Sequence, residues 1–287
     1  MSASTVPDFQ ERPWPPLRNL VVGYLEQTRP HTMWGLGEVD VTETLLRLKR
    51  CQRELRLAVS FHAVILHALA RAAAAHPGVQ TYRHGNRLVT FQEVDVCTTI
   101  DRRFDGHRMP AVHTVRGAQR KSLAAINWEL REAINRPPPN DPTVRLRHRF
   151  ARLPGFVRRW LGRMVSANPH RLRQVYGTIG LTNLNSHGLN RPLWGLPPTL
   201  CTVTMSAGAI VERLAVDAQG RVQARKHLCV GGAADHAVVD GMPLSRFTLE
   251  VYRQLESGEA LNDDFIAETR RLAAADPELA KRGPEGS

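Results

Sequence analysis

The sequence predicts a mixed α+β domain in which helices cover one face of a β-sheet. Two observations predict this class. Helical and strand-like segments alternate through the first 135 residues, and a block of β-type segments follows from residue 177. No internal repeat and no clear linker interrupts this order, so we expect a single domain. A length of 287 residues is sufficient to bury a hydrophobic core.

The expected helices are recognised by apolar residues at three- and four-residue spacing. They cover 17–27, about 45–55, 60–75, 122–134, 156–165 and 243–255. Ser60 and Ser122 stand where N-caps are favoured, and Pro243 lies in the first turn of the last helix. Proline and glycine residues at 77–78 end the helix 60–75, and three prolines at 137–139 end the helix 122–134.

The expected strands are rich in β-branched residues or alternate in polarity. They cover 32–41, 82–91 with a turn at 84–86, 94–100, 109–115, 177–183, 199–206, 209–216 and 222–230. A hairpin turn at 217–220 joins the last two. We therefore expect the C-terminal half to supply much of the sheet.

The composition restricts the classes of partner. The net charge of +12 arises from arginines spread along the chain, most densely over 145–173. Solvated basic faces or a rim that attracts a polyphosphate ligand are both compatible with this charge. No aromatic-interleaved platform or zinc-finger spacing is present, so we expect no nucleic-acid partner.

The sequence contains no signal for a membrane span, a signal peptide or a cysteine pair. No apolar run of about 18 residues occurs, and residues 1–16 lack the order of a signal peptide, so we expect a cytoplasmic protein without a membrane partner. Four cysteines lie far apart and form no C-x-x-C pair, which favours buried free thiols over a metal site or a disulfide. They are Cys51, Cys97, Cys201 and Cys229.

The stretch 230–241 carries the clearest chemical signal. A strand leads into Asp235-His236, and a helix follows Asp240-Gly241. Histidine is the natural base near neutral pH. His236 and Asp240 could converge on one site, or Asp240 could only anchor the turn. A lone histidine beside an aspartate is more often structural than catalytic.

This stretch resembles a known family. His236-x-x-x-Asp240-Gly241 is similar to the active-site signature of the dihydrolipoamide acyltransferase component of 2-oxo acid dehydrogenase complexes, which chloramphenicol acetyltransferase shares. Four other segments resemble the family in the same order along the chain. They are 29–31, 55–60 with the helix after it, 120–123 and 177–184. The resemblance implies a chloramphenicol acetyltransferase-like two-layer αβ sandwich with a large mixed sheet.

The resemblance also implies a mechanism. An acyl group passes from a coenzyme A thioester to a thiol or hydroxyl, with His236 as general base and the Thr182 hydroxyl as oxyanion donor. Asp240 matches a carboxylate that holds the active-site loop through an arginine, for which Arg18 is the candidate, and Gly241 supports that loop. A strand-filling Thr182 and an unpaired Arg18 remain alternatives.

Partners follow from the same resemblance. The family forms trimers, so we expect a homotrimer in which His236 and Thr182 come from neighbouring subunits. Asn183 and His187 could line the acceptor side or belong to a surface loop. We expect no covalently bound cofactor and no metal. The acyl donor is an acyl-CoA, and the acceptor is a small molecule or a lipoyl group on a partner protein.

The chain departs from the family in several respects. We expect an N-terminal arm at 1–16, a catalytic domain at 17–258 with a divergent insert at 137–175, and a polar C-terminal tail at 259–287, without a lipoyl domain. Ala237 stands where the dehydrogenase family has arginine, which favours a free small-molecule acceptor. Three functions remain open. They are a stand-alone acyl-CoA acyltransferase, a dihydrolipoamide acyltransferase acting on a lipoylated partner, and a catalytically silent trimeric scaffold.

Overall fold

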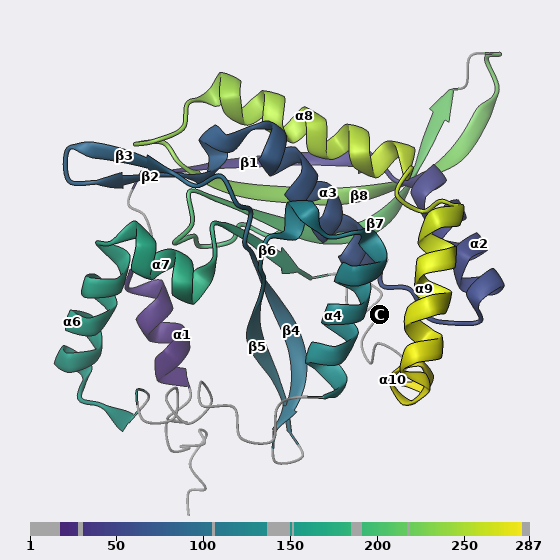
Figure 1. Ribbon diagram of the computed structural model, residues 1–287. Coiled ribbons are helices and arrows are strands. Elements are labelled where there is room, and N and C mark those ends of the chain that lie inside the picture. The colour runs from purple at the N-terminus through teal and green to yellow at the C-terminus, as the bar shows by residue number, and fades with distance from the viewer. Residues whose placement is uncertain are drawn as a thin grey trace, which may run out of the picture.

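A six-stranded mixed β-sheet organises the chain, with its strands in the order β1-β8-β7-β6-β4-β5 (Figure 1). The computed structural model describes residues 18–27, 31–104, 107–136, 150, 152–184, 191–216 and 219–282. The sheet strands are β1 (Thr32–Asp40), β4 (Val96–Phe104), β5 (His107–Val115), β6 (Ile179–Asn183), β7 (Val203–Val216) and β8 (Val222–Asp235). A separate hairpin contains β2 (Thr81–His84) and β3 (Arg87–Thr90).

Helices cover one face of this sheet, and a group of three helices lies at one end of the molecule (Figure 1). The covering helices are α2 (Thr42–Leu55), α3 (Phe61–Ala75), α4 (Leu123–Asn135), α8 (Gly241–Ser257), α9 (Asp263–Ala275) and α10 (Pro277–Lys281). The end group contains α1 (Arg18–Leu25), α6 (Gly155–Ser166) and α7 (Pro169–Tyr176). Two short 3-10 helices, Pro77–Gln80 and Ala118–Arg120, lie in connections.

The strand pairing brings distant segments together. β6 runs parallel to β7 on one side and to β4 on the other. The remaining neighbours, β1 with β8, β7 with β8 and β4 with β5, are antiparallel. The expected mixed sheet is therefore present, and the first strand of the chain lies beside the last.

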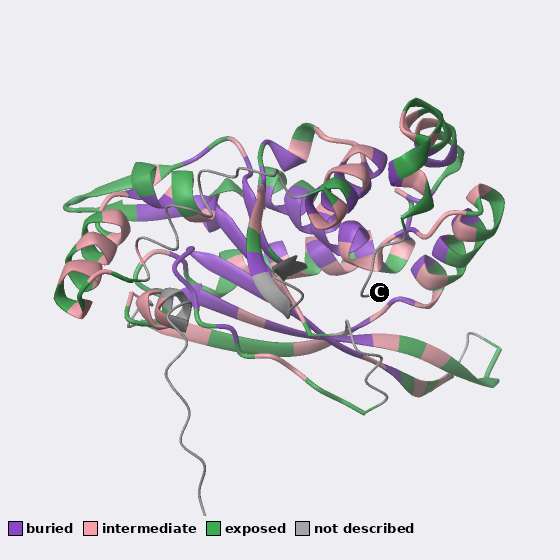
Figure 2. Cartoon of the chain, turned by 90° about the horizontal axis from the view of Figure 1, so that it is seen from below, coloured by how far each residue is buried: buried purple, intermediate pink, exposed green. Residues whose placement is uncertain are grey.

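The hydrophobic core lies between the sheet and its helices, where buried residues gather in Figure 2. Ile179 and Leu181 of β6 point into this core, and Phe247, Val251 and Leu255 of α8 meet it from above. Because side chains alternate along a strand, the residues between them face the opposite side of the sheet. That opposite face carries the polar positions discussed below.

Two differences from the sequence expectation concern the sheet and the C-terminal part of the chain. The strands expected at 199–206 and 209–216 form the single strand β7, with a register shift between Ala207 and Ile210. The expected polar tail 259–287 contains α9 and α10, and Phe265 and Ile266 of α9 belong to the main core. Packed structure therefore continues well past the expected boundary at residue 258.

The cysteine, membrane and metal signals can be compared with the described residues. All four cysteines are free thiols, three of them buried and Cys97 half-buried. Within the described ranges, no helix is long and apolar enough to cross a membrane. The same ranges contain no group of side chains suited to hold a metal ion.

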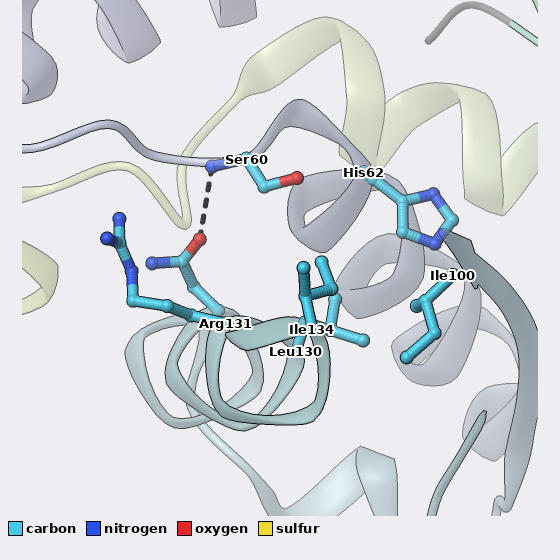
Figure 3. A pocket seen from close by; sticks show the side chains of 7 residues that line it. Ser60, His62, Ile100, Leu130, Arg131 and Ile134 are labelled. Atoms are coloured by element: carbon cyan, nitrogen blue, oxygen red, sulfur yellow. Dashed lines mark hydrogen bonds between the residues drawn. The ribbon is translucent and has the colours of Figure 1, made fainter. Parts of the chain in front are cut away.

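Two histidines on α3 lie in desolvated surroundings. Nε2 of His62 lies 2.7 Å from the Thr98 hydroxyl, and the ring borders a cavity of about 30 Å³ with Ile100 and Ile134 (Figure 3). Burial lowers the pKa of His62 to about 4. Burial, together with the nearby charge of Arg71, lowers the pKa of His67 to about 4 as well.

These shifts predict an acid-sensitive fold. A histidine whose pKa falls from 6.5 when unfolded to about 4 when folded stabilises the native state fully above pH 6.5. That stability is lost as the pH falls from 6.5 towards 4, because the unfolded chain binds more protons. We expect each histidine to contribute a loss of about 1–3 kcal/mol in the free energy of unfolding. Urea denaturation at successive pH values would measure it, and His62→Gln should flatten the profile. If the free energies of unfolding of the native chain and of His62→Gln differed by the same amount at every pH, the lowered pKa of His62 would be contradicted.

Candidate active site

His236 stands in a fixed loop directly after β8. Its backbone N–H donates to the carbonyl of His31 at 2.8 Å, just before β1. The preceding residue, Asp235, is buried, and its carboxylate accepts the N–H of Ala237 at 3.1 Å. The Asp235 carbonyl also accepts the N–H groups of Val238 and Val239. The backbone around His236 is therefore held on both sides, while 54% of its side chain is exposed.

Asp240 and Gly241 form the start of α8. Asp240 occupies the N-cap position, and its side chain makes no capping hydrogen bond. Its Oδ1 lies 3.8 Å from Nδ1 of His236, too far for a hydrogen bond. With the Asp240 side chain 85% exposed, water screens the attraction between them. Arg18 opens α1, but its side chain lies outside the described residues, so its pairing with Asp240 stays a prediction.

Thr182 lies on β6 and faces away from the helices. It alternates with Ile179 and Leu181, which point into the core. On β7 its partner is Ser206, whose hydroxyl is buried and has no hydrogen-bond partner in the described structure. Thr182 itself is half-buried.

Of the two residues expected on the acceptor side, only Asn183 lies within the described residues. Asn183 ends β6, is half-buried and points to the face opposite that of Thr182. His187 lies outside the described residues. The acceptor-side role of both residues stays a prediction.

The strand register separates the two main site residues within one chain. Thr182 is level with Ser206 on β7, and Ser206 is level with Gly231 on β8. His236 follows five residues beyond Gly231, which is about 15 Å along the strands. Two strand spacings add about 10 Å across the sheet. His236 and Thr182 of the same chain therefore cannot act on one reacting group.

A segment of irregular chain lies flat on the face that carries Thr182. Trp194 donates from Nε1 to the Gly37 carbonyl at 3.0 Å, and Ala209 N–H donates to the Leu193 carbonyl at 3.0 Å. A side chain on Gly231 would collide with the backbone carbonyl of Gly195. Gly231 therefore makes room for this segment to lie against the sheet.

The contact at Gly231 predicts a large effect of a small substitution. We expect Gly231→Ala to lower the free energy of unfolding by about 1–3 kcal/mol, because the added methyl meets a backbone atom that cannot yield. Gly35→Ala is the matched control, since nothing lies within 4 Å of a methyl there. Urea denaturation of both variants measures the difference. Equal stability of the two would contradict the close packing of 191–200 on the sheet.

Part of the chain matches a known protein family. Residues 170–262 match the family model described as 2-oxoacid dehydrogenases acyltransferase (catalytic domain). The matched part includes Thr182, His236, Asp240 and Gly241. These matched residues carry the catalytic-domain signature of that family. The resemblance drawn from the sequence is thereby confirmed. A search of curated proteins gave no significant match.

Solved structures confirm the fold of the chain. A probable dihydrolipoamide acetyltransferase from Listeria monocytogenes superposes with a TM-score of 0.62 and 16% identity, over 90% of this chain and 97% of the other. The cubic core of a pyruvate dehydrogenase multienzyme complex gives a TM-score of 0.64 and 14% identity, over 91% and 97%. Dihydrolipoamide acetyltransferase from Azotobacter vinelandii gives 0.64 and 15%, over 88% and 94%.

Sequence reasoning did not identify two residues that shape the site. Asp235 holds the loop of His236 through its buried carboxylate, and Ser206 is paired with Thr182 on the neighbouring strand. The Asp-His pair in the sequence was a signal for the first. The second depends on the pairing of β6 with β7, which no local pattern reveals.

Proposed function

We propose that this chain is an acyl-CoA-dependent acyltransferase with His236 as its general base. The imidazole removes a proton from the thiol or hydroxyl of the acceptor, whose sulfur or oxygen then attacks the thioester carbonyl. The tetrahedral intermediate collapses with release of the coenzyme A thiolate, which takes the proton back from the imidazolium. Acyl group, proton and electron pairs are thereby conserved without a covalent enzyme intermediate.

One observation carries this proposal. His236 combines a backbone held by hydrogen bonds on both sides with a half-exposed imidazole, within a stretch that matches the acyltransferase family. A structural histidine would be expected to use a ring nitrogen in a buried hydrogen bond, as Nε2 of His62 does with Thr98. An imidazole that is fixed in position and open to solvent suits proton transfer to a bound substrate.

The oxyanion donor in this proposal is Thr182 of a neighbouring copy. A hydroxyl aimed at the developing oxyanion contributes about 3–4 kcal/mol in comparable sites. Within one chain the register keeps Thr182 about 15 Å or more from His236. A site that uses both groups therefore needs two copies, and a closed homotrimer supplies three such sites by symmetry.

A second candidate acceptor is a lipoyl group on a partner protein. Two of the similar structures are named dihydrolipoamide acetyltransferases, and a third comes from a pyruvate dehydrogenase complex. Ala237 instead of arginine after the histidine favours the free small-molecule acceptor. The two proposed reactions use the same base and the same acyl donor. They differ only in which acceptor accelerates the release of coenzyme A.

The role of His236 is tested by coenzyme A release from a panel of acyl-CoAs, with and without dihydrolipoamide. We expect His236→Ala to reduce turnover by about two to four orders of magnitude, because the acceptor loses its base. Stimulation by dihydrolipoamide would select the lipoyl acceptor. If the native chain neither binds nor consumes any acyl-CoA, a silent scaffold replaces the enzyme. Gly35→Ala serves as the control that should keep full activity.

The two-copy site is tested by mixing inactive chains. We expect Thr182→Ala to lower turnover by about a hundredfold or more. Co-expression of the His236→Ala and Thr182→Ala chains should restore about a quarter of the native activity, since one interface in four then pairs an intact base with an intact donor. A chain carrying both substitutions, mixed with His236→Ala, should restore nothing. Equal activity in both mixtures would show that the site does not span two copies.

A further inference from the structure

The outward face of α6 combines a ridge of large apolar side chains with arginines. Phe156, Trp160 and Met164 follow one another at four-residue spacing, so they line one side of the helix. Phe156 is 69% exposed and Trp160 is 60% exposed. Arg159 and Arg163 lie beside this ridge and are exposed as well. We define these five residues as the α6 ridge.

The inner face of α6 explains how the ridge is held outward. Val165 packs against a small core that includes Leu172 and Tyr82. The Gln27 side chain lies against Gly162, and the Ser166 hydroxyl donates to Gln27 Oε1 at 3.1 Å. The helix is thus attached through its other side, and the ridge is not turned outward by chance rotation of a loose segment.

The charge around the ridge is mainly positive. The helix Gly155–Ser166 contains three arginines and no acidic residue. Glu26, just after α1, approaches Arg159 only to 3.9 Å, in exposed surroundings where such a pair is weak. The hairpin β2–β3, at the same end of the molecule in Figure 1, adds exposed Arg83 and Arg87. This end of the protein therefore attracts a negatively charged surface.

We propose that the α6 ridge docks the protein on an anionic lipid surface. Tryptophan and phenylalanine beside arginines, on a helix of low overall hydropathy, are the composition of helices that lie in the membrane interface. The three apolar side chains follow one line along the helix, whereas proteins that bind single-stranded nucleic acid use a basic groove with aromatic rings on which bases stack. The proposal departs from the absence of a membrane partner expected from the sequence, because only the structure separates the ridge from the packed side of α6.

The ridge is independent of the proposed chemistry. The acyltransferase family match begins at residue 170, after α6 has ended, and α6 packs on α1 and α7 at the end of the molecule. Variants of the ridge should therefore keep the coenzyme A release measured without lipid. Failure of the docking proposal and failure of the enzymatic proposal are distinguishable in this way.

Vesicle co-sedimentation tests the proposal. The full chain is mixed with phosphatidylcholine vesicles, either pure or with roughly a third of phosphatidylglycerol added. We expect binding to the anionic vesicles only, weakened by high salt. Phe156→Ala with Trp160→Ala should reduce the partition coefficient by about tenfold or more. Arg159→Gln with Arg163→Gln should reduce it by about fivefold for each charge removed.

A matched control comes from the tip of the β7–β8 hairpin. Leu214 and Val216 are also large, apolar and exposed, so Leu214→Ala with Val216→Ala should leave vesicle binding unchanged. Trp160→Phe keeps the apolar ridge but should abolish the blue shift of tryptophan fluorescence on binding. Thermal unfolding by circular dichroism verifies that each variant is folded, and the arginine pair tests the ridge without truncating an apolar residue.

Several outcomes would overturn the proposal. The native chain could ignore anionic vesicles, or the Phe156→Ala, Trp160→Ala variant could bind them as well as the native chain does. A duplex oligonucleotide could bind while vesicles do not, which would assign the ridge to nucleic acid. Light scattering could show that the same variant loses its oligomeric state, which would make the ridge an interface between copies.

Discussion

The register between β7 and β8 is the constraint on which the site depends. Pairing of Val203 with Ala234 places the end of β8, and with it His236, at one edge of the sheet. The same strand β7 carries Ser206, which sets the level of Thr182 on β6. A shift of one residue would turn every side chain to the opposite face. The core positions on β6 and β8 would then be exposed, so burial of the core also fixes the two site residues.

The second constraint is the close approach of backbone to backbone on the face opposite the helices. Segment 191–200 lies against β7 and β8 only because Gly208 and Gly231 present no side chain to it. The same small residues could equally have left an open channel beside the sheet. A glycine has this ambiguity in any sequence, because it permits empty space and close backbone contact equally well. Only the path of the distant segment decides between the two.

The sequence predicted the elements whose signal is local. The apolar spacing of 60–75 and 243–255 and the alternation of 94–100 identified α3, α8 and β4, because burial of one face produces those patterns. Three short helices, α7, α9 and α10, were missed or understated, although Asn168, Asn262 and Asp276 cap their first turns. Their caps lie among many polar residues, so a capping residue without a strong apolar stripe was not a sufficient signal. The order β1-β8-β7-β6 joins segments far apart in the chain, which no local pattern encodes.

The same distinction explains the candidate site. His236 and Asp240 were correctly placed at a strand-to-helix turn, since β8 ends just before the histidine and α8 begins just after the aspartate. Their side chains nevertheless do not form a hydrogen bond, because Asp240 turns into the N-cap of α8 and remains in solvent. The exposed imidazole of His236 and the half-buried Thr182 lie about 15 Å or more apart along the strands of one sheet. Neither residue alone forms a complete site. In the proposed chemistry His236 is the base and Thr182 the oxyanion donor, and the register keeps them too far apart within one chain. Assembly of copies, rather than folding of the single chain, would then complete the site.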